Sequence, residues 1–122
     1  MKKIINIILK IILSLIIIMP ILGTLGIFPP ATPDMYNTTK AYDFIIMITN
    51  AGYIMWIMTV VYIICLGLII KNKMALVALL LLPITINIVG FHAFLDGGLL
   101  TPGAIMGNVF FLINIYFLWQ NR

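Results

Sequence analysis

The chain has 122 residues, of which 64% are hydrophobic and 8% charged, and its mean hydropathy is +1.24. Ordinary soluble domains carry roughly 25% charged residues, and a chain of this length has too little interior to hide so much apolar surface, so a soluble globular protein is excluded. The net charge of +4 comes from cations that form no clustered basic face, which also excludes a nucleic-acid partner. The composition instead predicts a single all-α membrane domain over residues 1–122, whose main partner is the lipid bilayer.

The first predicted span covers residues 4–28, a long apolar run that follows Met1, Lys2 and Lys3. A cleaved signal peptide is the alternative, because a basic start fits it as well. However, the run is longer than a usual signal core, and no small-x-small cleavage site follows it. Lys10 lies within the run, where its stem can stay in the acyl region while its amine reaches the headgroups. We therefore expect a membrane span whose hydrocarbon part begins near residue 11.

A loop and a short helix are expected after this first span. Pro29, Pro30 and Pro33 remove backbone donors and fix φ, so residues 29–40 are predicted to form a loop. In residues 41–50 apolar side chains recur at helical spacing, but this segment is too short to cross a bilayer. We expect it to be a helix that lies at the outer membrane interface.

Three further spans complete the predicted fold, over residues 53–70, 74–95 and 104–119. About 20 apolar residues cross a bilayer, so the expected fold is a four-helix transmembrane bundle with a short outer interfacial helix between spans one and two. Four spans place six of the seven cations on the side of both chain ends and all three aspartates on the other side. Because Lys and Arg near span ends prefer the cytoplasmic side, both termini are predicted to be cytoplasmic.

Polar residues in the third predicted span, 74–95, are candidates for a functional site. At 100° per residue, Thr85, His92 and Asp96 share one face, whereas Asn87 lies on a stripe at the roughly opposite side. Polar groups inside a membrane mark faces that meet other helices or water. These two faces predict a helix that touches two neighbours.

His92 is the one histidine of the chain and is expected at the outer rim. A rise of about 1.5 Å per residue puts it about 28 Å from Lys73, near the far edge of a ~30 Å hydrocarbon layer. One interpretation is a proton-exchanging group in an outward-facing pocket, where Asp96 or Asp43 would favour the imidazolium form. The other is a structural histidine that satisfies the backbone or a neighbouring helix. Asn87 is similarly either an interhelical hydrogen-bonding residue or a ligand contact.

Catalytic and metal-binding motifs are not found in the sequence. One His, one Cys and no Glu leave no HExxH motif, no Cys pair and no bis-histidine haem site within one chain. Ser14 is expected near the inner end of its span, far from His92, so it lacks a base for nucleophilic catalysis. We expect no catalytic residue, no metal and no cofactor.

Gly103 and Gly107 form a GxxxG motif at the start of the fourth predicted span, and Phe111 and Asn114 continue the same face. Small residues at this spacing let two membrane helices approach closely. The motif is common in apolar helices, so it predicts a close helix contact without saying whether the contact lies within the bundle or between copies.

Residues 78–95 resemble a sequence signature of DoxX-like membrane proteins, which is carried here by Asn87, Phe91 and His92. The order of parts is also similar: a basic residue early in the first span, a proline-bearing outer loop, a short helix ending in a small-Gly-Tyr turn, and a basic hairpin at residues 71–73. The resemblance implies a four-span protein of the bacterial cytoplasmic (inner) membrane. Some relatives are associated with quinone-linked sulfur or respiratory oxidoreductases.

By this resemblance Asn87, Phe91 and His92 are candidate ligand-binding positions, to which Asp43 and Asp96 of the outer rim are added. Our leading interpretation is an accessory or structural subunit that docks to a larger membrane complex or associates with itself. The alternative is a quinone-linked redox subunit, in which Asn87 and His92 hydrogen-bond a quinone headgroup between the second and third spans.

Overall fold

The computed structural model describes residues 1–121, which form five α-helices and one short 3₁₀ helix and contain no β-strand. In chain order the elements are α1 (Lys2–Thr24), η1 (Pro33–Met35), α2 (Thr39–Ala51), α3 (Tyr53–Ile70), α4 (Met74–Phe94) and α5 (Ala104–Gln120). The predicted all-α class is therefore confirmed. The short helix expected between the first two long helices is present as α2.

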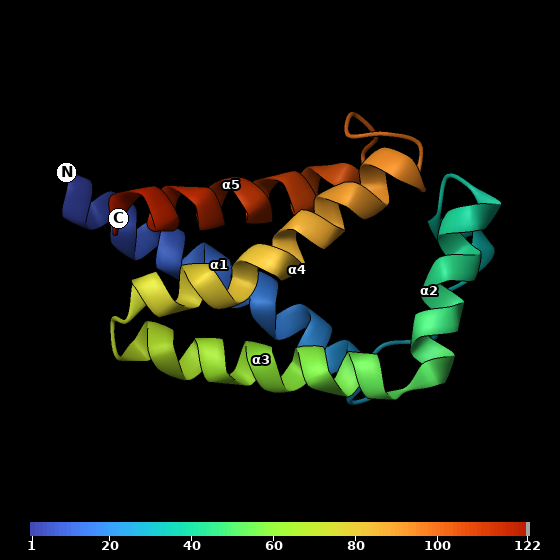
Figure 1. The fold of residues 1–122 in the computed structure, drawn as a ribbon, viewed down its shortest axis with the longest axis horizontal. Coiled ribbons are helices and arrows are strands. Elements are labelled where there is room, and N and C mark those ends of the chain that lie inside the picture. Colours follow the sequence, from blue (N-terminus) through green and yellow to red (C-terminus); the bar gives the residue numbers. More distant parts are fainter. Residues whose placement is uncertain (122) are drawn as a thin grey trace.

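Three helices, α1, α3 and α4, are long and apolar enough to cross a membrane, and α5 is apolar but shorter, with 17 residues. At about 1.5 Å per residue α5 is about 26 Å long, slightly less than a ~30 Å hydrocarbon layer. Figure 1 shows that these four helices run in alternating directions, so that α1 begins and α5 ends at the same end of the molecule. The helix α2 lies across the opposite end (Figure 1), which we call the outer end.

Residues with positive φ end two of the long helices. After α1, Gly26 has φ 83° and the Ile27 amide donates to the Leu22 carbonyl at 3.2 Å, a Schellman cap. The helix therefore ends at Thr24. The predicted span runs four residues further, because a pattern of apolar residues does not indicate where a cap ends the helix. After α3, Asn72 takes the corresponding place with φ 59°, which produces the predicted tight link to α4.

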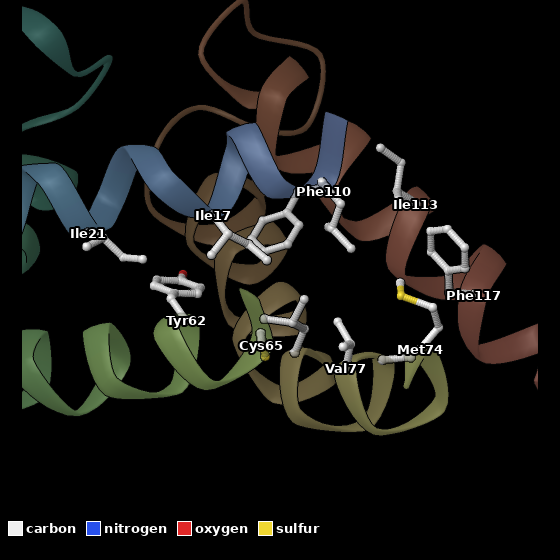
Figure 2. Close-up of a cluster of buried hydrophobic side chains, with 12 residues drawn as sticks. Ile17, Ile21, Tyr62, Cys65, Met74, Val77, Phe110, Ile113 and Phe117 are labelled. Carbon is white, nitrogen blue, oxygen red and sulfur yellow. The ribbon is translucent and has the colours of Figure 1, made fainter. Parts of the chain in front are cut away.

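The core is a cluster of buried apolar side chains to which α1, α3, α4 and α5 all contribute (Figure 2). Ile17, Tyr62, Val77 and Phe110, one from each helix, are at most 3% exposed. In a membrane such contacts stabilise mainly through close packing, because lipid tails are as apolar as the side chains. Only 11% of the residues in the most apolar 18-residue stretch of α1 are buried, so the rest of the chain leaves most side chains of this helix at least partly uncovered.

The helix α4 packs against α3 on one side and α5 on the other, and α1 contacts both α3 and α5. The prediction that α4 touches two neighbours is confirmed, although the Asn87 face from which one of them was predicted is exposed. Pro83 lies within α4 and lacks the N–H that would bond to the Leu79 carbonyl. Figure 1 shows that α4 changes direction along its length, as expected for a helix with an internal proline.

Candidate functional site

Asp96 follows α4 at the outer end and is only 3% exposed although it is a carboxylate. Its Oδ1 accepts a hydrogen bond from the Asn37 amide N–H at 2.8 Å, and its backbone carbonyl accepts one from Asn37 Nδ2 at 3.1 Å. A buried carboxylate is costly unless it is hydrogen-bonded, and the bond from the Asn37 N–H offsets part of that cost. The two bonds fasten the loop before α2 to the end of α4.

Thr38 extends the same connection and starts α2. Its hydroxyl oxygen accepts a hydrogen bond from the Ala41 amide at 3.1 Å, which is the usual N-cap arrangement, and its O–H donates to the Leu95 carbonyl. One side chain therefore fixes both where α2 begins and where its N-terminus sits. We call Asn37, Thr38, Leu95 and Asp96 the outer latch.

His92 lies one helical turn before Asp96 and faces it. Its Nδ1 is 3.4 Å from Asp96 Oδ2, and the His92 side chain is 13% exposed. Within residues 1–121 this buried Nδ1 has no hydrogen-bond partner. The contact is an ion pair only when the imidazole is protonated, and a neutral ring needs the Nδ1–H tautomer to donate toward the carboxylate. The His92 imidazole and the Asp96 carboxylate therefore face one another at the outer latch.

The helix α5 closes the other side of His92 at a glycine. A Cβ added at Gly107 would lie 3.3 Å from His92 Cδ2 and 2.8 Å from Ile88 Cγ2, so α4 and α5 can approach this closely only without a side chain there. A Cβ at Gly103 would lie 4.0 Å from Asp96 Oδ2. The close contact that the GxxxG motif predicts is thus found within the chain, where both glycines line the His92 and Asp96 side chains.

Aromatic rings connect the site to the loop and to α2. Phe91 lies 5.8 Å from Phe44 of α2 and 6.3 Å from Tyr36, measured between ring centroids. Burial raises the pKa of Tyr36 above 10, and the negative charges of Asp96 and ionised Tyr42 add to this effect. The Tyr36 hydroxyl therefore stays neutral at physiological pH and can donate a hydrogen bond beside the Asp96 carboxylate.

The structure brings three of the five candidate residues together and leaves two apart. Phe91, His92 and Asp96 form one cluster at the outer end. Asp43 is exposed on α2, and Asn87 is exposed on α4, where its Nδ2 donates to the Pro83 carbonyl at 2.7 Å. His92 packs against α5, so Asn87 and His92 do not converge between α3 and α4.

One correction concerns the face of α4 that carries Asn87. The sequence predicts that this stripe meets a neighbouring helix. Within residues 1–121 this prediction is wrong, because Pro83 and Phe94 of the same stripe are exposed too. The bond to Pro83 explains how this is possible. An asparagine that satisfies its amide on its own helix needs no partner on another.

Sequence reasoning missed other residues that the structure makes important. Asn37 and Tyr36 lie in a proline-rich loop, where no periodic pattern indicates which side chains are anchored. Asn114 is fully buried, and its Nδ2 donates to the Ala78 carbonyl of α4 at 3.2 Å. Its place on the Gly107 face of α5 was the available signal, since that face packs on α4.

The cluster at the outer end has few side chains that could bind a metal ion. Among residues 1–121 no three His, Cys, Asp or Glu side chains come together as a metal site would require. Comparison with protein-family models, with curated proteins and with solved structures finds no match to this chain. The fold and the site together define a class: an all-α protein with three helices fit to span a membrane and a hydrogen-bonded polar cluster at one end.

Proposed function

We propose that this chain is a multi-pass protein of the bacterial cytoplasmic (inner) membrane that crosses it four times, with both termini in the cytoplasm. The alternating directions of α1, α3, α4 and α5 support an even number of spans (Figure 1). Charge supports the orientation, because all three aspartates lie in the segment from residue 34 to residue 96, at or beyond the outer ends of the spans. The described cations at the opposite end are Lys2, Lys3, Lys10, Lys71 and Lys73.

In this membrane the protein acts as an accessory or structural subunit that docks to a larger membrane complex, as a DoxX-like protein would. The observation that carries this proposal is the exposure of two apolar side chains at the outer end, Phe94 at 87% and Leu100 at 98%. At about 1.5 Å per residue Phe94 is about 31 Å from Lys73, and Leu100 follows in the loop beyond α4. Both lie at or past the edge of a ~30 Å hydrocarbon layer, where lipid tails do not cover them. The surface of a partner protein would cover both side chains.

The outer latch supports the same function. In it, the buried carboxylate of Asp96 and the hydroxyl of Thr38 form hydrogen bonds that hold the loop and α2 in place. A rigid outer end lowers the entropy that docking costs. These polar groups therefore prepare a surface for a partner without any chemical step.

A quinone-linked redox role is the second candidate, and one observation favours it. His92 Nδ1 is buried and has no hydrogen-bond partner within residues 1–121, and its contact with Asp96 Oδ2 is 3.4 Å long, so it could donate to a bound ligand. Asn87 lies outside that cluster, so a quinone would need His92 together with another donor, for which Tyr36 is available.

Membranes solubilised in mild detergent and separated on native gels distinguish these functions. The accessory role predicts a complex much larger than one chain, which Leu100→Ser disrupts. Ile70→Ser, a change at an apolar residue that is 86% exposed at the opposite end, should leave the complex intact. A differently tagged second copy in the complex would show self-association. A single-chain species carrying quinone that is lost in His92→Gln would overturn the accessory role in favour of the redox one.

A further inference from the structure

A cavity of about 490 Å³ lies beside the beginning of α1, at the end of the molecule opposite the outer latch. Its lining consists of Lys2, Lys3, Asn6, Ile7, Lys10 and Asn72. Three of these six side chains are ammonium groups and two are amides. The exposed surface of the cavity is mostly apolar, so the lysine alkyl stems and Ile7 line it together with these polar groups, a mixture that suits an anion carrying an apolar part.

The walls of this cavity are held in place by hydrogen bonds between separate helices. Lys10 Nζ donates to Asn72 Oδ1, which joins α1 to the turn between α3 and α4. Asn6 Nδ2 donates to Gln120 Oε1 at 3.1 Å, and Asn6 Oδ1 accepts from the Tyr116 hydroxyl at 2.7 Å, which joins α1 to α5. A lysine ammonium has three donors, so Lys10 keeps two for a ligand. The groups are thus arranged before any ligand arrives.

Side-chain carboxylates that could neutralise these lysines are remote. The chain has three acidic side chains, and they lie at residues 34, 43 and 96 toward the outer end. Lys71 and Lys73 flank Asn72 and add to the positive charge of this end. An anion from the surroundings can therefore bind here without competition from a side-chain carboxylate.

Apolar side chains along α1 indicate where that anion comes from. Ile7 lines the cavity itself, and Ile8, Ile11 and Leu15 follow at helical spacing toward the bilayer interior, with exposures of 49%, 56% and 60%. A small soluble anion would make no contact with this apolar strip. The acyl chains of a phospholipid would lie along it while the phosphate enters the cavity. Basic pockets at the cytoplasmic ends of membrane helices suit anionic lipid headgroups.

We propose that this cavity binds the phosphate headgroup of an anionic phospholipid, held by the ammonium groups of Lys2, Lys3 and Lys10 and by the Asn6 and Asn72 amides. The bound lipid fastens the start of α1 to the turn between α3 and α4. The site depends on neither a partner complex nor the outer cluster.

The test uses the full chain in micelles of a neutral detergent, mixed with equal amounts of phosphatidylglycerol and phosphatidylcholine. Native mass spectrometry then gives the ratio of the two bound lipids. Each lysine near a lipid phosphate contributes a factor of about five, so three lysines should favour phosphatidylglycerol roughly 100-fold. The double variant Lys3→Gln/Lys10→Gln should lower this ratio roughly 25-fold. Lys40→Gln, which removes a cation near the start of α2, is the matched control and should not change it.

Three outcomes would overturn the proposal: no preference in the wild type, an equal loss in Lys40→Gln, or displacement of the lipid by an equal concentration of inorganic phosphate, which would point to a soluble anion. If Lys3→Gln/Lys10→Gln does not fold, Lys2→Gln/Lys3→Gln replaces it, because both of those lysines are exposed. The measurement needs neither an orientation nor a partner. Its failure would therefore leave the proposed accessory function untouched.

Discussion

Asn37 and Asp96, 59 positions apart in the chain, are joined by two hydrogen bonds at the outer end of the molecule. One runs from the Asn37 amide to the Asp96 carboxylate and the other from the Asn37 side chain to the Asp96 carbonyl. Together with Thr38 they bring the loop that follows α1 against the end of α4. The position of α2 thus depends on a contact with a helix that follows it much later in the chain.

Replacing Asp96 by Ala should loosen this loop, although the bonds to the Asp96 and Leu95 backbone carbonyls remain. The Asn37 N–H would lose its partner, and an unsatisfied buried polar group costs about 1–3 kcal/mol. We expect a lower midpoint of thermal unfolding in detergent and faster proteolysis within residues 25–38. Asp43→Ala removes an exposed carboxylate from α2 and is the matched control. Equal behaviour of the two variants would show that the outer latch does not hold the loop.

Gly107→Ala should separate α4 from α5. The new methyl group would meet Ile88 Cγ2 at 2.8 Å, and overpacking of this kind typically costs about 1–3 kcal/mol. Gly90→Ala adds the same methyl group to α4 where nothing lies within 4 Å, so it should be neutral or slightly stabilising. Unfolding followed by circular dichroism compares the two. A Gly107→Ala variant as stable as Gly90→Ala would contradict this packing.

Asn114 and Asn87 should behave differently when each is replaced by Ala. Asn114→Ala removes the bond to the Ala78 carbonyl on the neighbouring helix and should cost about 1 kcal/mol, a typical value for such bonds in membranes. Asn87→Ala removes only a bond within α4 at an exposed position and should change stability by less than about 0.5 kcal/mol. Steric trapping in micelles measures both. A larger effect at Asn87 would indicate that a partner covers it.

Tyr36 should ionise only above pH 10, because burial and the Asp96 charge raise its pKa. The folded state holds the phenol proton more tightly than the unfolded state, so the corresponding stability is present below pH 10 and lost as pH rises through the raised pKa. The ultraviolet titration of the wild type minus that of Tyr36→Phe isolates this group. In Asp96→Asn the Tyr36 pKa should move part of the way back, since burial is the larger cause. A Tyr36 pKa that is the same in the wild type and in Asp96→Asn would contradict the influence of the Asp96 charge on Tyr36.

Much of the helical pattern can be predicted from the sequence because apolar runs and turn residues are local signals. The starts of α3 and α4 and the turn at Asn72 agree with the predicted spans at 53–70 and 74–95. Where α1 ends was harder, since Gly26 terminates the helix inside an apolar stretch. The DoxX-like resemblance and its quinone alternative stay predictions.

The candidate site was only partly predictable, for a physical reason. A helical wheel places His92 and Asp96 on one face, and the structure confirms that they meet. It cannot identify the partner of Asp96, because Asn37 belongs to a loop without periodicity. Nor can it decide that Asn114 is buried and Asn87 exposed, since that depends on which neighbouring helix covers each face.

The most direct test of four spans with both ends inside uses cysteine labelling on intact bacterial cells. Cys65 is the single cysteine, so Cys65→Ala provides the background for Lys2→Cys, Lys40→Cys and Asn121→Cys. A membrane-impermeant maleimide should label the Lys40→Cys variant on intact cells, and the other two only after permeabilisation. Labelling that places residues 2 and 121 on opposite faces of the membrane would contradict the four-span orientation.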